Sequence, residues 1–249
     1  MKRILFLSLA VFITCSSHSD INFGNQEITS FSKSKRLLED KVFFDNKVTL
    51  YCNASYTDNK DVILPLGVKC KSKTCKKIEW EHIIPAENFG RNFSSWRDGD
   101  KRCISKSGKK MSNRQCATKI DKEFSLMHAD MYNLYPAIGA VNRVRKNYNF
   151  TILSDNIASS FGSCQFKVSQ NKVQPPVSSR GIIARTHLYF DAVYPKFNLS
   201  KQQRQLMQAW DKMYPVTKLE CLRAKRIKAI QKNKNPILEK ACKVFENNA

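Results

Sequence analysis

The sequence predicts an α+β fold, in which mixed helices and short strands share one core and disulfides staple the loops. Hydrophobic residues make up 42% of the 249 positions, which is enough for a packed core and argues against global disorder. Segments with alternating apolar residues indicate short strands, and segments with apolar residues every three or four positions indicate helices. The chain has nine cysteines, of which Cys15 lies in an apparent export leader and eight follow it. An even number of cysteines in an exported chain favours disulfides.

The first 19 residues have the features of a secretory signal peptide. Lys2 and Arg3 precede an apolar stretch over residues 4–13, and Ser17 and Ser19 fit a cleavage site after residue 19. The stretch is too short to span a bilayer, and no other segment is long and apolar enough. We therefore expect a signal peptide over residues 1–19 and one domain over residues 20–249. The mature chain would be a periplasmic or secreted monomer without a membrane partner.

The N-terminal half is expected to contain one helix and two strands. Apolar residues between Phe31 and Phe43 recur at helical spacing. The second strand should end at Pro85, because proline cannot donate a hydrogen bond to a sheet. The expected elements are a helix within residues 20–47, a strand over residues 48–52, a basic loop over residues 53–77 and a strand over residues 78–84.

The C-terminal half is expected to be mainly helical. Long segments with helical periodicity alternate there with prolines, which end helices. The expected elements are an irregular region over residues 88–119 stapled by Cys103 and Cys116, helices over residues 124–131 and 137–146, strand-like pieces such as residues 161–168, helices over residues 182–194, 201–212 and 219–232, and a polar tail after Pro236.

The net charge limits the partners that this chain can have. Lysine and arginine outnumber aspartate and glutamate by 43 to 21, which gives a formal charge of +22 and a pI near 9.7. A surface this positive attracts polyanions, namely nucleic acid, anionic lipid or acidic glycans. Charge alone does not choose among these three partners.

Glu81 and His82 lie at the end of the second expected strand. A rigid strand end can hold a carboxylate, which suits a hard cation such as Mg²⁺, beside an imidazole, which suits proton abstraction from water. Glu-His pairs are also common without any catalytic role. A zinc site is a further alternative, because Cys70 and Cys75 are near in sequence, although the tight second pair of a zinc ribbon is missing.

Asn133 is a second candidate ligand, 51 residues after His82. On a short helical turn its amide would offer a neutral oxygen that suits Mg²⁺ beside a carboxylate. Taken alone, an asparagine at such a place is more often a cap or turn residue.

The chain resembles the bacterial endonuclease I family of secreted and periplasmic nucleases, which have a ββα-metal (His-Me finger) site. The resemblance rests on several separate motifs that follow one another in order along most of the mature chain. These motifs are residues 79–86, residues 130–136 with Asn142 beyond them, residues 180–186, residues 197–200 running into Trp210, and further matches through residues 215–216, 226–227 and 233–236.

The resemblance implies a site and a reaction. Glu81 and Asn133 would bind one Mg²⁺, with Mn²⁺ or Ca²⁺ as substitutes, and His82 would be the general base. Lys101 or Arg102 would take the place of the family's arginine that holds the cleaved phosphate. The chain would be a sequence-nonspecific endonuclease that binds DNA through its phosphates and leaves 5′-phosphate products. RNA would be a further substrate. The alternative is a secreted cationic protein that binds nucleic acid or other polyanions without catalysis.

Other polar residues are expected to have structural roles. Arg185 lies in an apolar helix and needs a partner; a buried carboxylate such as Glu79 or Asp130 is favoured, and a phosphate is the alternative. His187, in the same helix, is expected to be a buried histidine with its hydrogen bonds satisfied. His128 is near Asn133 in sequence and is expected to pack, or else to contact the site.

Overall fold

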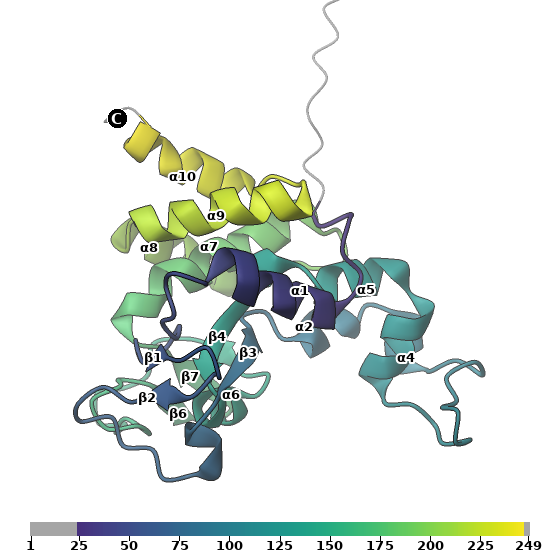
Figure 1. Cartoon of the computed structure of the whole chain (residues 1–249), viewed down its shortest axis with the longest axis horizontal. Coiled ribbons are helices and arrows are strands. Elements are labelled where there is room, and N and C mark those ends of the chain that lie inside the picture. The colour runs from purple at the N-terminus through teal and green to yellow at the C-terminus, as the bar shows by residue number, and fades with distance from the viewer. Residues whose placement is uncertain (1–23, 247–249) are drawn as a thin grey trace, which may run out of the picture.

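The structure of the chain is a computed structural model that describes residues 24–246; the signal peptide expected over residues 1–19 lies outside this range. The described chain combines helices with small sheets of two or three strands, so the α+β prediction is confirmed. In Figure 1 the strands gather at one end of the molecule, and the long C-terminal helices cover the other.

Helices occur throughout the described part of the sequence. Their bounds are α1 Phe31–Leu37, the π-helix η1 Leu38–Val42, the 3₁₀-helix η2 Lys73–Cys75, α2 Ala86–Gly90, α3 Ser94–Arg97, α4 Asn113–Ile120, α5 Lys122–His128, the 3₁₀-helix η3 Met131–Asn133, α6 Gly139–Arg145, α7 Val177–Val193, α8 Lys201–Met213, α9 Lys218–Gln231 and α10 Pro236–Glu246. The strands are β1 Ser55–Tyr56, β2 Val62–Ile63, β3 Ile78–His82, β4 Leu134–Ile138, β5 Asn149–Phe150, β6 Lys167–Ser169 and β7 Lys172–Gln174.

β3 and β4 form the antiparallel ribbon that carries the candidate catalytic residues. The register runs from Ile78 opposite Ile138 to His82 opposite Leu134, and α6 begins directly after β4. β3 confirms the strand predicted there, whereas β4 was not predicted because Pro136 indicated a break. A two-stranded ribbon has only edge strands, so a proline fits, and the Pro136 carbonyl accepts a bond from Leu50 N at 2.8 Å.

The strand predicted over residues 48–52 is wrong. Val48 makes a single bridge to Ser55, and residues 50–52 form a turn. Thr49 closes this turn, because its N–H donates to the Ala54 carbonyl and its Oγ1 accepts from Ala54 N, both at 2.9 Å. The turn places Tyr51 in the core, where it is 1% exposed.

The C-terminal helices agree with the prediction except at the tail. α7 begins at Val177, five residues before the predicted start, and α8 and α9 are close to their predicted bounds. Residues 236–246, predicted to be a polar tail, form α10. Asn235 Oδ1 accepts bonds from Ile237 N and Leu238 N and so begins this helix, and Leu238 is buried.

The eight cysteines of the described chain form four disulfides, which confirms a disulfide-stapled fold. Cys103 pairs with Cys116, as predicted for the irregular region. Cys70 pairs with Cys75, so neither has a free thiolate for a zinc ion. The other two bonds are Cys52–Cys164 and Cys221–Cys242.

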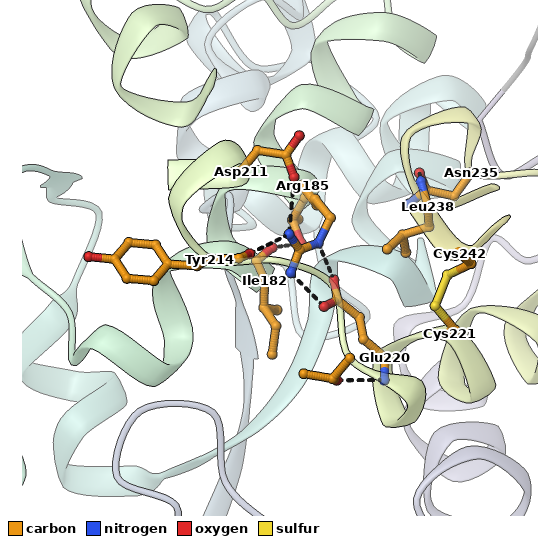
Figure 2. Close-up of polar contacts among 11 residues, drawn as sticks. Ile182, Arg185, Asp211, Tyr214, Glu220, Cys221, Asn235, Leu238 and Cys242 are labelled. Carbon is orange, nitrogen blue, oxygen red and sulfur yellow. Dashed lines mark hydrogen bonds and ion pairs between the residues drawn. A yellow bond between two sulfur atoms is a disulfide. The ribbon is translucent and has the colours of Figure 1, made fainter. Parts of the chain in front are cut away.

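Arg185 joins three helices through a buried ion-pair network (Figure 2). From α7 it donates two hydrogen bonds to Glu220 of α9, at 2.7 and 2.6 Å, one to Asp211 of α8 at 3.0 Å and one to the Tyr214 carbonyl at 2.9 Å. A structural role is therefore confirmed, but the suggested partners, Glu79 and Asp130, were wrong.

The suggested partners of Arg185 have other contacts. Glu79 pairs with Arg143, and Asp130 accepts bonds from the hydroxyls of Tyr189 and Tyr194. His187 is buried, with Nδ1 2.8 Å from the Ile183 carbonyl, as expected.

Among residues 24–246 there is no helix with the length and hydrophobicity needed to cross a membrane.

Candidate active site

Glu81 and His82 line one pocket of about 460 Å³ at the end of β3. α1, α4 and α6 contribute other walls. Five basic residues line the pocket, namely Lys35, Lys60, Arg114, Arg145 and Lys146. Lys35, Arg114 and Lys146 make no ion pair with any residue between 24 and 246, so their charge is available to an anionic ligand.

Glu81 is a buried carboxylate with its two oxygens in different surroundings. It is 3% exposed, and Oε1 accepts a hydrogen bond from the Tyr51 hydroxyl at 2.6 Å and lies 3.5 Å from Arg145 Nε. Oε2 has no hydrogen bond to any described residue. Burial raises the pKa of Glu81, and the opposing effects of Arg145 and Tyr51 do not cancel it. A cation beside Oε2 would stabilise the charged form.

His82 is held in the orientation and protonation state of a general base. Its Nε2 lies 2.9 Å from the His128 carbonyl oxygen. A carbonyl only accepts, so Nε2 carries the proton and Nδ1 has a free lone pair. Burial, and then repulsion from nearby positive groups, lowers the pKa of His82 well below its usual value near 6.5. The ring is therefore neutral at pH 7.

Arg145 fixes the end of β3 from the last turn of α6. It is 1% exposed, its Nη1 donates to the His82 carbonyl at 3.1 Å, and its Nη2 donates to the Ile83 carbonyl. These bonds hold the backbone that presents Glu81 and His82. Sequence reasoning did not identify Arg145 or Tyr51, since both lie far from Glu81 along the chain.

The structure places Asn133 outside the pocket. Asn133 is fully buried, its Oδ1 accepts from Ile84 N at 2.8 Å, and its Nδ2 donates to the Ile84 carbonyl at 3.0 Å. Both halves of its amide therefore bind backbone, as a structural turn residue does. This geometry does not support the prediction that Asn133 shares a metal site with Glu81.

Asn142 is the asparagine that the fold brings to the pocket. It lies on α6, directly after β4, and lines the pocket with Glu79 and Glu81. Its Nδ2 donates to Glu79 Oε2 at 3.2 Å, and its Oδ1 has no hydrogen bond to any residue of the described chain. Position 142 was part of the sequence motif, but no metal role was predicted for it.

Lys101 and Arg102 are not among the residues that line the pocket. They lie between α3 and α4, in a segment that protrudes from the body in Figure 1. Arg102 donates two side-chain bonds to Asp100, at 2.8 and 2.7 Å, and is exposed. Arg114, on α4, is the arginine from this part of the chain that does line the pocket.

The pocket can hold a hard cation. Glu81 and Asn142 each offer an oxygen without a hydrogen-bond partner, and carboxylate and amide oxygens are ligands that Mg²⁺ accepts while it keeps several waters. No cluster of three or more His, Cys, Asp or Glu side chains arranged to hold a metal exists among residues 24–246. The donor set therefore suits a partly hydrated oxygen-binding ion better than zinc.

His128 packs against His82, the candidate general base. Its ring stacks on that of His82, with centroids 4.8 Å apart and planes 9° apart, and on that of Phe124. Neither ring nitrogen has a hydrogen-bond partner in the described chain, and His128 is not among the residues that line the pocket. The packing role is confirmed, and contact with the site runs through its backbone carbonyl.

The His128→Phe variant is expected to lose part of the pH dependence of stability. Burial lowers the pKa of His128 to about 4, so below pH 6.5 the unfolded chain binds a proton that the folded chain does not. The free energy of unfolding therefore falls as the pH drops from 6.5 towards 4, by about 2–3 kcal/mol from this group. Urea unfolding at pH 7 and pH 4.5 measures the difference, and equal pH slopes in the two proteins would contradict it.

Comparison with known proteins agrees with these features. An endonuclease I family model matches residues 8–242, and the chain belongs to that family. It is therefore an enzyme, a hydrolase of the nuclease class, as the resemblance implied.

Three relatives show how far the similarity extends. An extracellular deoxyribonuclease of Aeromonas hydrophila is 34% identical over 250 residues, which cover 97% of this chain and 99% of the relative. A periplasmic deoxyribonuclease of the same species is 35% identical over 87% of this chain and 88% of the relative. Endonuclease-1 of Buchnera aphidicola subsp. Baizongia pistaciae (strain Bp) is 31% identical over 100% of this chain and 98% of the relative.

Proposed function

We propose that this chain is an exported, sequence-nonspecific endonuclease that hydrolyses DNA with His82 as general base and one Mg²⁺ at Glu81. The observation that carries the proposal is the bond between His82 Nε2 and the His128 carbonyl, which leaves Nδ1 as a base next to Glu81 in a basic pocket. The succession of β3, β4 and α6, of which β3 and α6 line this pocket, supports a ββα-metal site.

The protein's own residues account for the proton transfer and for phosphate binding. His82 Nδ1 accepts a proton from a water molecule, whose oxygen attacks phosphorus. The bond between phosphorus and the 3′ oxygen breaks and the leaving oxygen takes a proton from solvent water, so the products have 5′-phosphate and 3′-hydroxyl ends. Lys35, Arg114 and Lys146 bind the phosphate oxygens that face the pocket. Burial keeps His82 neutral and therefore able to accept the proton at pH 7.

Glu81 and Asn142 are the residues that we propose for the metal. Asn142 replaces Asn133 in this role, because the Asn133 amide is bonded to Ile84 on both sides. Bound Mg²⁺ supplies positive charge to the phosphate and to the leaving oxygen in the transition state, and Mn²⁺ or Ca²⁺ are substitutes to test. We keep Lys101 and Arg102 as predicted phosphate contacts, made outside the pocket.

DNA is the substrate that the relatives favour, since two of them are named deoxyribonucleases. Contacts to phosphates carry no sequence information, so cleavage is expected to be nonspecific, and RNA contains the same bond. The relatives' names, extracellular and periplasmic deoxyribonuclease, support export. We propose that the signal peptide over residues 1–19 directs this export.

Plasmid cleavage by the purified, oxidised chain tests the metal and its ligands together. We expect degradation with Mg²⁺ and none with EDTA. Asn142→Ala should raise the Mg²⁺ concentration needed for half-maximal rate at least about tenfold. The matched variant Asn133→Ala should leave that concentration unchanged and lower stability, because it removes two buried hydrogen bonds.

The opposite pattern would return the metal role to Asn133. A chain that shifts plasmid in a gel but leaves it intact with Mg²⁺ would be the cationic binder of nucleic acid, and the endonuclease proposal would be wrong.

A further inference from the structure

An exposed apolar segment begins with β2, continues beyond it and has no role in the candidate active site. We call residues 62–68 the apolar tip. Leu66 is 100% exposed, Ile63 58% and Leu64 36%. In Figure 1 this loop lies at the end of the molecule opposite α9 and α10. Single exposed apolar residues are ordinary, but three in four consecutive positions mark a surface that meets an apolar partner.

The apolar tip is held in a fixed shape. Ser163 Oγ donates to the Leu66 carbonyl at 3.0 Å, Ser163 N donates to the Gly67 carbonyl at 2.9 Å, and Lys69 N donates to the Phe161 carbonyl at 3.1 Å. Gly67 has a φ of +78°, which only glycine adopts without strain. The protein therefore builds the tip to project Leu66, and the exposure is not a consequence of a loose chain.

Basic residues flank the apolar tip. We call Lys69, Lys71, Lys73 and Lys76 the lysine cluster; all four are exposed. None of them forms an ion pair within the described chain, and no acidic residue occurs between Asp61 and Glu79. The Cys70–Cys75 disulfide and η2 fix the segment that carries them. The lysine cluster is therefore exposed and begins directly after the apolar tip in the chain.

We propose that the apolar tip and the lysine cluster dock this protein on an anionic membrane surface. Apolar side chains enter the boundary between headgroups and acyl chains, and lysines next to them bind acidic headgroups. Nucleic acid would satisfy the lysines but not Leu66. A second copy of the chain would satisfy Leu66 but would bring two proteins of like charge together. An anionic lipid surface satisfies both, which departs from the expectation of no membrane partner.

Sedimentation with vesicles, in EDTA and without DNA, tests docking independently of catalysis. We expect binding to phosphatidylcholine vesicles with about 30% phosphatidylglycerol and weak binding to pure phosphatidylcholine, at about 0.15 M salt. The triple variant Ile63→Ser/Leu64→Ser/Leu66→Ser should bind at least about tenfold more weakly. The variant Lys69→Gln/Lys71→Gln/Lys73→Gln should also bind more weakly.

A matched control separates docking from general attraction of a basic protein. Val177, Met213 and Leu219 are 55%, 64% and 57% exposed on other elements, so Val177→Ser/Met213→Ser/Leu219→Ser should bind like the wild type. Leu66→Trp should shift its fluorescence to shorter wavelength with the anionic vesicles, and Leu219→Trp should not.

Three outcomes would overturn the docking proposal. The first is that the wild type does not bind anionic vesicles. The second is that the wild type and the apolar-tip variant bind equally well. The third is that the wild type self-associates with increasing concentration and the apolar-tip variant does not. The last would make the apolar tip a contact between two copies of the chain. Each of these outcomes is independent of nuclease activity, so failure of the proposed function leaves docking to be judged by itself.

Discussion

His82→Ala is expected to lower the rate of Mg²⁺-dependent plasmid cleavage by about 10²–10⁴-fold, the usual value of general-base assistance. The ring removed is the one whose Nε2 is bonded to the His128 carbonyl and whose Nδ1 is free. Because the loss is of a group that acts in the transition state, it should appear in kcat more than in KM. Single-turnover rates with a labelled duplex measure this directly.

His187→Ala is the matched control for His82→Ala. Like His82, His187 is buried and hydrogen-bonded to a backbone carbonyl. Burial lowers the pKa of His187 to about 4. Unlike His82, it does not line the candidate pocket. This variant should retain cleavage within a few-fold when it is folded, as circular dichroism can establish. Equal losses in the two variants would remove the base assignment and indicate a general packing defect.

Arg185→Leu is expected to lower the free energy of unfolding by about 3–5 kcal/mol, because it leaves Glu220 buried without its partner. Arg185 and Glu220 each have side chains that are 3% exposed, and the pair lies where α7, α8 and α9 meet. For a chain of this size the change corresponds to a fall in Tm of roughly 10 °C. Thermal unfolding followed by calorimetry measures it.

Arg226→Leu provides the comparison for a surface ion pair. Arg226 pairs with Asp45, and their side chains are 20% and 43% exposed, so its loss should cost about 1 kcal/mol or less. The double variant Arg185→Leu/Glu220→Leu should recover part of the stability that Arg185→Leu loses, because it removes the unpaired charge. A similar, small effect of Arg185→Leu and Arg226→Leu would show that the buried network does not hold the helices together.

Local patterns predicted the elements that depend on neighbours in sequence. The alternation of residues 78–82 and their stop before Pro85 correctly gave β3, and helical spacing gave α7, α8 and α9. β4 was missed because the Pro136 rule assumes a strand inside a sheet, whereas this strand belongs to a two-stranded ribbon. α10 was missed because residues after Pro236 were judged polar, although apolar residues recur at helical spacing at Ile237, Leu238, Ala241 and Phe245.

The site was predictable only in part, because its geometry depends on contacts between distant residues. Glu81 and His82, which line the same pocket, were proposed from adjacent positions on one strand. Sequence could not distinguish Asn133 from Asn142 as the proposed ligand, since the choice depends on which amide is bonded to the Ile84 backbone and which lines the pocket. Tyr51 and Arg145 reach Glu81 from 30 and 64 positions away, and no local pattern predicts such contacts.

The group that orients the proposed base is a backbone carbonyl, and this has a consequence for substitutions at position 128. A substitution at position 128 changes the side chain and leaves the oxygen that holds His82 Nε2 in place. The side chain at position 128 acts on His82 mainly through its size and flatness, because the ring stacks between His82 and Phe124. We therefore expect a flat side chain of similar size at position 128 to keep His82 in the same orientation.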